Sequence, residues 1–276
     1  MTTEADFPDH SDIVPRRAPM ARRLMDVPAL LPLATFAAIL ILWEVGTRLL
    51  SVPTYVLPPP SRIVEGFGSI DAARWFQHVW ATLRVALMGF AVAIAISLPV
   101  AIGLARSALL SRCLYPLLVV IQSVPVVAVA PIIIVVLGTG DAPRITITFL
   151  IAFFPLVVSM TTGLTSTPPE LIELSRSLDA PLRRELSQIR IPYAMPHIFA
   201  GLKISITLSV IGAVVAEFVA AEAGLGYFIQ FSTSMFRLPQ AWAGLAVLVA
   251  LSLALFQAVN LAQRVFFPWS LSGNRK

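Results

Sequence analysis

Long apolar runs constrain the fold of this 276-residue chain more than any other feature of its sequence. A helix needs about 20 residues to cross the roughly 30 Å of hydrocarbon in a bilayer. With 57% hydrophobic and 13% charged residues, the composition is that of an integral membrane protein. The sequence therefore predicts an all-α polytopic membrane protein, with spans at Val85–Ala105, Cys113–Gly140, Ile145–Pro169, Ile204–Ala216 extending to Ala221, and Ala241–Gln263.

A sixth apolar run, from about Val27 to Leu50, carries Glu44 and Arg48 near its far end, where such side chains reach the interface. Arginines precede it, which also fits a cleaved signal peptide. We favour a membrane anchor, because the run is longer than a signal core and no small-x-small cleavage site follows. The predicted organisation is a disordered cytoplasmic tail (1–25), a first transmembrane helix (26–50), an external loop (51–80), a five-helix core (81–270) and a cytoplasmic tail (271–276).

The basic residues predict the orientation of the six spans. With the amino terminus inside, 14 of the 20 Lys and Arg residues fall on the cytoplasmic side. Cytoplasmic loops carry an excess of Lys and Arg, so both termini are expected to be cytoplasmic. The other six basic residues lie outside or at the outer interface, namely Arg48, Arg62, Arg74, Arg84, Arg144 and Arg237.

The external loop is expected to hold a short interfacial helix. Residues 58–60 are three prolines, and a mixture of polar and apolar residues follows, up to Trp75 and Trp80. Tryptophans anchor helices at the membrane surface. His78, which lies between them, is therefore expected to be an interfacial residue rather than a ligand.

Several functions lack the residues that they require. A P-loop needs Gly-Lys-Ser/Thr, but the two lysines follow Leu202 and Arg275, so this chain is not expected to bind ATP. The three histidines form no H-E-x-x-H motif, so no metal site is expected. A single cysteine, Cys113, cannot form an intramolecular disulfide. No aspartate lies inside a predicted span, so an intramembrane aspartyl protease lacks its catalytic residues. The basic residues are scattered, which argues against nucleic-acid binding. We therefore predict no catalytic residue, cofactor or metal.

Charge is concentrated in one predicted cytoplasmic segment, which has eight charged residues in the 21 positions 170–190. Thr167-Pro168-Pro169-Glu170 has the spacing of a capping box with proline at the first helical position. A helix is expected to begin there and to end at Asp179-Ala180-Pro181. A second short helix then carries charged residues on one side and, on the other, Leu182, Leu186 and Ile189.

The spacing in this segment resembles the cytoplasmic loop of ABC importer permeases, the membrane subunits that work with a separate substrate-binding protein. That loop carries Glu-Ala-Ala, then Gly after three more residues, then Ile-x-Leu-Pro after nine. Here Glu173 stands at the Glu, Leu174 and Ser175 at the two Ala, Asp179 at the Gly, and Ile189-Arg190-Ile191-Pro192 at the end. Asp179 is the main departure, because a left-handed turn suits Gly better than Asp.

The resemblance covers roughly residues 58–269 and is nearest to the branch that moves nitrate, sulfonates, taurine and pyrimidine precursors of thiamine. The segments "FFPLVVSMTTGL" and "GLKISITLSVIGAVVAEFVAAEAGLGYFI" carry it outside the loop. It implies a type I importer permease fold in a prokaryotic inner membrane, two copies of this chain, cytoplasmic ATPase subunits, and an external binding protein that delivers a small polar solute. The implied ATPase-coupling residues are Glu173, Ser175, Leu178, Asp179, Ala180, Arg183, Ile189 and Pro192.

The outer end of the predicted fifth span adds candidates for the translocation path or an outer gate. Glu217 is either an acid facing the path or, as we favour, an interfacial structural residue. Gly224 and Gly226 belong to a tight outer turn that ends at Tyr227. Two other functions stay open at this point, a stand-alone secondary transporter or channel, and an intramembrane enzyme, for which no nucleophile with a nearby base is evident.

Overall fold

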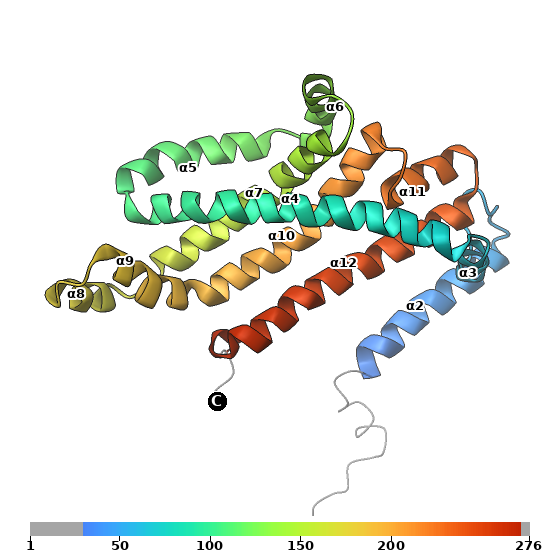
Figure 1. Cartoon of the computed structure of the whole chain (residues 1–276). Helices are drawn as coiled ribbons and strands as arrows, with labels where there is room; N and C mark the ends of the chain where they lie inside the picture. The colour runs from blue at the N-terminus through green and yellow to red at the C-terminus, as the bar shows by residue number, and fades with distance from the viewer. Residues whose placement is uncertain (1–29, 272–276) are drawn as a thin grey trace, which may run out of the picture.

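The computed structural model describes residues 30–271, and every regular element in that range is helical (Figure 1). The predicted all-α membrane fold is confirmed, whereas residues 1–25 and 272–276 of the predicted tails lie outside the described range. The long apolar helices are α2 (Leu30–Leu49), α4 (Ala72–Arg106), α7 (Asp141–Thr165), α10 (Ile191–Ala220) and α12 (Leu238–Phe266). The shorter helices are α3 (Pro60–Gly68), α5 (Ala108–Ser123), α6 (Val126–Leu137), α8 (Pro169–Ser177), α9 (Leu182–Glu185) and α11 (Leu225–Ser234).

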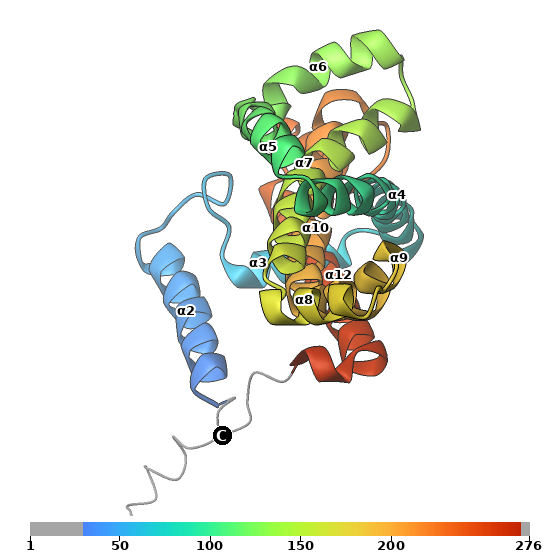
Figure 2. The same ribbon diagram turned by 90° about the vertical axis from the view of Figure 1, so that its left-hand side faces the viewer.

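Helix α7 forms the centre of the bundle, because it packs along its length against both α4 and α10 (Figure 2). Ala152 and Leu156 are completely buried there. The Ser205 hydroxyl donates a hydrogen bond of 2.9 Å to the carbonyl oxygen of Ala152. A Cβ atom on Gly212 would lie 2.8 Å from the Cα atom of Thr148. Small residues therefore let these helices approach closely, as is common between helices in membranes.

Helices α5 and α6 form a broken span. The sequence predicts one span over Cys113–Gly140, but the two helices are bent by 92° at Val124-Pro125. Proline lacks an N–H and disfavours the helical conformation at the residue before it, and Val124 is accordingly extended, with ψ of 122°. Both α4 and α7 run toward the end of the bundle that carries α8 (Figure 1), so α5 and α6 together must cross back. Counted this way, the described residues contain the six predicted spans.

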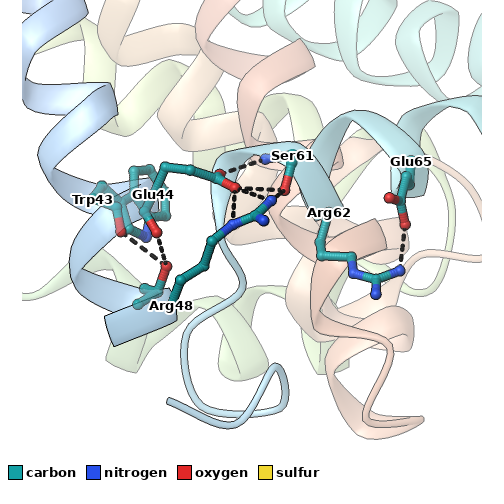
Figure 3. A network of polar contacts seen from close by, with 7 residues as sticks. Trp43, Glu44, Arg48, Ser61, Arg62 and Glu65 are labelled. Atoms are coloured by element: carbon teal, nitrogen blue, oxygen red, sulfur yellow. Dashed lines mark hydrogen bonds and ion pairs between the residues drawn. The ribbon is translucent and has the colours of Figure 1, made fainter. Parts of the chain in front are cut away.

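Helix α2 stands beside the bundle rather than inside it (Figure 2). Its carboxyl-terminal end is joined to α3 by Glu44, whose carboxylate accepts hydrogen bonds from the N–H and hydroxyl of Ser61 at 3.0 and 2.9 Å (Figure 3). Arg48 also pairs with Glu44. Pro59, the N-cap residue of α3, has no side-chain hydrogen bond to the helix. Glu44 therefore supplies the negative charge that a helix N-terminus favours, and it joins two helices rather than only reaching the interface.

The prediction of an interfacial helix within residues 51–80 is only partly correct. Helix α3 lies in this segment, but α4 already begins at Ala72 and includes Trp75. Trp75 is 8% exposed, and its ring centroid lies 5.2 and 5.0 Å from those of Phe67 and Phe228. Because other helices cover this large apolar ring, it belongs to the core and does not serve as a surface anchor.

Candidate functional site

Helices α8 and α9 project from the end of the bundle opposite α3 and α11 (Figure 1). Helix α8 begins at Pro169, with Pro168 as its N-cap residue and no side-chain cap. The hydroxyl of Thr167 lies 3.4 Å from the carbonyl oxygen of Leu164 and is turned back toward the preceding helix. The predicted capping box is therefore wrong. The second proline shifted the helix start by one residue, because either proline can occupy a first-turn position.

A Schellman turn ends α8 at the position where the resembled loop has glycine. The N–H of Ala180 donates to the carbonyl oxygen of Ser175 at 3.1 Å, and the N–H of Asp179 donates to that of Arg176 at 3.0 Å. Asp179 has φ of +49°, the left-handed conformation that favours Gly. Both the predicted helix end and the left-handed position of Asp179 are confirmed.

Large apolar side chains around this turn are exposed. Leu174 and Leu178 are 56% and 72% exposed. Ala180 and Ile189 lie with them along a groove of about 240 Å³ between α8 and the residues after α9. Apolar residues at a helix turn outside the spans have little reason to be exposed unless another surface covers them.

The second predicted helix is not a separate element. Helix α9 continues through a π-helical turn, Leu186–Arg190, directly into α10, so one helical stretch runs unbroken from Leu182 to Ala220. Pro192, predicted to end the loop, lies in the first turn of α10, where proline is tolerated. The guanidinium Nε of Arg190 donates to the buried carboxylate of Glu185 at 2.7 Å and holds the π-helical turn.

The eight predicted coupling residues all lie at this end of the bundle, but their side chains differ in exposure. Ser175 is buried, at 5% exposure, and faces the interior of the helix pair. Glu173, Asp179 and Arg183 are exposed. Ion pairing joins none of these three to another residue within the part of the chain that the structure describes. Their charges therefore remain available to a partner surface.

Glu217 is the centre of a buried network at the opposite end of the bundle, beside α11. It is 1% exposed. Its carboxylate accepts hydrogen bonds from the Thr82 hydroxyl at 2.8 Å and from the N–H of Gly226 at 2.7 Å. Thr82 in turn accepts a bond of 2.8 Å from the N–H of Leu225. Glu217 is thus structural, as favoured from the sequence, but it is buried between α4, α10 and α11 rather than at an interface.

Glycine is required at position 224 in this network. Gly224 has φ of +130°, a conformation that side chains rarely adopt, and a Cβ atom there would collide with the Glu217 carboxylate. The Gly224 N–H donates a bond of 3.2 Å to Nδ1 of His78. His78 therefore positions the turn before α11, although the sequence suggested an interfacial residue.

Sequence reasoning missed Thr82 and the role of His78. Thr82 lies 135 residues before its partner Glu217, and nothing in its local sequence distinguishes it from other threonines in apolar helices. A pairing over such a distance follows only from the packing of α4 on α10. Within residues 30–271, no three His, Cys, Asp or Glu side chains come together to hold a metal ion.

Comparison with known proteins gives consistent matches over most of the chain. A family model described as "Binding-protein-dependent transport system inner membrane component" matches residues 93–270. The formylaminopyrimidine transport permease protein of Halalkalibacterium halodurans is 32% identical over 87% of this chain and 96% of that protein. The riboflavin transport system permease protein of Chloroflexus aurantiacus is 34% identical over 94% and 98%, respectively. The taurine transport system permease protein of Escherichia coli is 28% identical over 94% and 95%.

A solved structure shares the fold. In an inward-facing conformation of the MetNI methionine ABC transporter, one chain aligns with a TM-score of 0.61 and 23% identity, covering 68% of this chain and 94% of that chain. Its sequence identity is low, so this likeness concerns the arrangement of helices alone. The fold predicted from the sequence, that of an ABC importer permease, is confirmed.

Proposed function

Because the chain belongs to the family of binding-protein-dependent transport system inner membrane components and is a membrane-spanning subunit of an ABC importer, we propose that α8 and α9 couple it to a cytoplasmic ATPase. The exposed Leu174 and Leu178 beside the turn after α8 carry this proposal. Interface energy is concentrated in a few desolvated contacts, while charges at the rim set orientation. Leu178 and Ala180 are the proposed anchors, with Glu173 and Arg183 at the rim.

The remaining coupling residues give the element its stiffness. Buried Ser175 and left-handed Asp179 fix the turn, and Ile189 packs along the groove beside α8. From Pro192 onward the chain is already part of α10. A displacement of α9 by the ATPase would therefore pass directly into a transmembrane helix without a flexible joint, which suits rigid-body rocking of a bundle.

The proposed assembly has two copies of this chain, cytoplasmic ATPase subunits and an external binding protein. The excess of Lys and Arg at the end that carries α8 supports placing that end, and both termini, in the cytoplasm. Helix α11 and the start of α4 then face the outside. Glu217, Gly224 and Gly226 hold α11 in place there. We propose that α11 belongs to an outer gate and that these buried residues fix its position.

The transported solute is proposed to be small and polar. Among the relatives, the named systems transport a formylaminopyrimidine, riboflavin or taurine. The first two are nitrogen heterocycles, and the third carries a sulfonate. A pyrimidine precursor of thiamine and a taurine-like sulfonate are therefore the two solute classes to compare.

The coupling proposal is tested by replacing Ala180 with Arg, which forces a bulky charge into the proposed contact. Uptake and recovery of the ATPase on the tagged permease should both be lost, while membrane insertion is kept because the site lies outside the spans. Ala73→Arg is the matched control, since Ala73 is exposed at the outer end of α4. Full uptake and normal ATPase recovery with Ala180→Arg would refute the assignment of α8 and α9.

The competing function is a stand-alone secondary transporter or channel. It differs from the importer in needing no ATPase. Reconstitution of the purified chain alone in liposomes distinguishes the two: an importer subunit should give no solute flux without its ATPase. Sustained ATP-independent flux through this chain alone would favour the competing function.

A further inference from the structure

A polar pocket of about 260 Å³ lies at the end of the bundle that carries α3 and α11 (Figure 1). Three separate parts of the chain line it: the start of α4, helix α11 with the turn before it, and the start of α12. The lining includes Arg74, Gln77, Tyr227, Phe231, Ser232 and Arg237. The pocket is therefore formed by the packing of these helices and not by one local turn.

Two guanidinium groups in this lining have no partner within the chain. Arg74 and Arg237 form no ion pair and no side-chain hydrogen bond within residues 30–271. The other arginines at this end each pair with a carboxylate, namely Arg48, Arg62, Arg84 and Arg144. Positive charge without a counter-charge is thus concentrated at the pocket.

A buried hydroxyl in the lining also lacks a partner. Ser232 is 2% exposed, and its hydroxyl makes no hydrogen bond to another described residue, whereas Thr233 and Ser234 bond to carbonyl oxygens of their own helix. A buried hydroxyl without a hydrogen bond is unfavourable. The Ser232 hydroxyl is therefore available to a polar group that enters the pocket.

The net charge of the lining favours an anion. Glu222 is the one acid that borders the pocket, against two arginines. Nδ1 of His78, which also borders it, accepts the N–H of Gly224, so this ring is neutral. Two positive charges and one negative charge leave one net positive charge.

The pocket lies at the depth of the lipid headgroups. Arg237 precedes the apolar run Ala241–Gln263 by four residues, or about 6 Å along a helix. Headgroups occupy roughly this distance beyond the hydrocarbon on each side of a bilayer. On α4, Phe76 and Trp80 are 70% and 55% exposed, as expected of aromatic side chains at the membrane interface.

Aromatic rings beside the arginines favour a lipid over a soluble anion. Phe231 borders the pocket, is 42% exposed and stacks on Tyr227 with ring centroids 5.9 Å apart. Phe236, next to Arg237 in the chain, is 79% exposed. The glycerol and first acyl carbons of a lipid would cover such rings while its phosphate meets the charge. A soluble anion would leave the rings uncovered.

We propose that this pocket binds the headgroup of an anionic phospholipid. A phosphodiester carries one negative charge, and its oxygens accept hydrogen bonds from the planar guanidinium groups of Arg74 and Arg237. Ser232 and Gln77 bond to the polar substituent of the phosphate. A cavity of roughly 150 Å³ holds benzene, so about 260 Å³ has room for a phosphodiester with a short polyol. The bound lipid would join the ends of α4, α11 and α12.

The experiment measures binding of phosphatidylglycerol to the full-length chain in a neutral detergent by native mass spectrometry, with phosphatidylcholine as the lipid without net charge. Phosphatidylglycerol should bind saturably and more tightly. Arg74→Gln and Arg237→Gln should each weaken it about tenfold, because each removes a charge-assisted hydrogen bond. Arg106→Gln, at an exposed arginine in the last turn of α4, is the matched control and should leave binding unchanged.

Two further variants separate recognition from loss of structure. Glu222→Gln removes the acid of the lining and should tighten phosphatidylglycerol binding. Ser232→Ala should weaken it. The melting temperature of Arg74→Gln without added lipid should equal that of wild type, so that weaker binding does not reflect unfolding.

The other outcomes overturn the proposal. Equal affinity for the two lipids, or equal phosphatidylglycerol affinity in wild type and Arg74→Gln, would show that the pocket does not select an anionic headgroup. Displacement of the lipid by inorganic phosphate or taurine, through the same two arginines, would assign the pocket to a soluble oxyanion. Neither an ATPase nor transport enters this measurement, so the coupling proposal stands or falls separately.

Discussion

Replacing Glu217 with Ala should destabilise the packing of α11 on the bundle. The Glu217 carboxylate is the acceptor for the hydroxyl of Thr82 and for the N–H of Gly226. Both donors are buried, so neither can bond to water once the acceptor is gone. The change therefore leaves two buried donors unpaired and removes the group that fills the space beside Gly224.

The expected cost follows from these two bonds. A buried donor without an acceptor costs about 1–3 kcal/mol, so Glu217→Ala should lower the stability of this end of the bundle by roughly 2–6 kcal/mol. Glu217→Gln keeps the shape and one carbonyl acceptor. It should therefore cost about half as much, because only one of the donors loses its partner.

The assay is thermal unfolding of the purified protein in detergent, combined with limited proteolysis of the segment before α11. The melting temperature should fall in the order wild type, Glu217→Gln, Glu217→Ala, and cleavage near Gly224 should increase in the same order. Glu222→Gln is the matched control, since Glu222 is exposed and lies in the sequence between Glu217 and Gly224. Equal melting and cleavage of Glu217→Ala and wild type would refute the view that this carboxylate holds α11.

Three further changes test other parts of the molecule. In a chain carrying Cys113→Ala, a cysteine at exposed Ser177 should be protected from an impermeant thiol reagent added outside cells, and one at Ser69 should be labelled; the reverse pattern would invert the topology. Asp179→Gly should raise the melting temperature slightly and keep uptake, because Gly adopts the left-handed conformation at φ of +49° without strain, and a clear loss of stability would contradict this. Glu44→Ala should increase proteolysis between α2 and α3 relative to wild type, and a rate equal to that of wild type would show that the carboxylate does not tie the two helices.

The transmembrane helices were predictable from the sequence because the bilayer imposes a minimum length on any apolar helix. The runs Val85–Ala105 and Ala241–Gln263 each fall inside one observed helix. Apolar composition does not determine whether the helix axis stays straight, however. The run Cys113–Gly140 satisfies the same criterion, although its two helices are bent by 92° at Val124-Pro125. Four other prolines, at 99, 116, 131 and 155, remain inside their helices, so the presence of proline alone did not identify the break.

The turn at Asp179 after α8 was predictable for a local reason. The turn is formed by the end of α8, one left-handed residue and the residue after it. These residues are neighbours in the sequence, so their spacing predicts the geometry of the turn. The start of α8 was mispredicted because Pro168 and Pro169 both satisfy the rules for a first turn. The continuity of α9 with α10 was also missed, since the charged face of 182–190 suggests a surface helix, whereas the Glu185–Arg190 pair allows those charges to lie at the base of a span.

The two ends of the bundle show why the turn at Asp179 could be predicted from the sequence and the hydrogen-bond network of Glu217 could not. At the end that carries α8, Glu173, Asp179 and Arg183 are exposed, and the charge of this segment is visible in the sequence as a local cluster. At the end that carries α11, Glu217 accepts hydrogen bonds from the Thr82 hydroxyl and the N–H of Gly226, and His78 accepts one from the N–H of Gly224. A buried acid paired across 135 residues looks, in sequence, like a lone charge in an apolar helix, which is also how an acid lining a path would look. Burial separates the two cases, because an acid that lines a path is exposed to that path, whereas Glu217 is 1% exposed and accepts its hydrogen bonds from the protein.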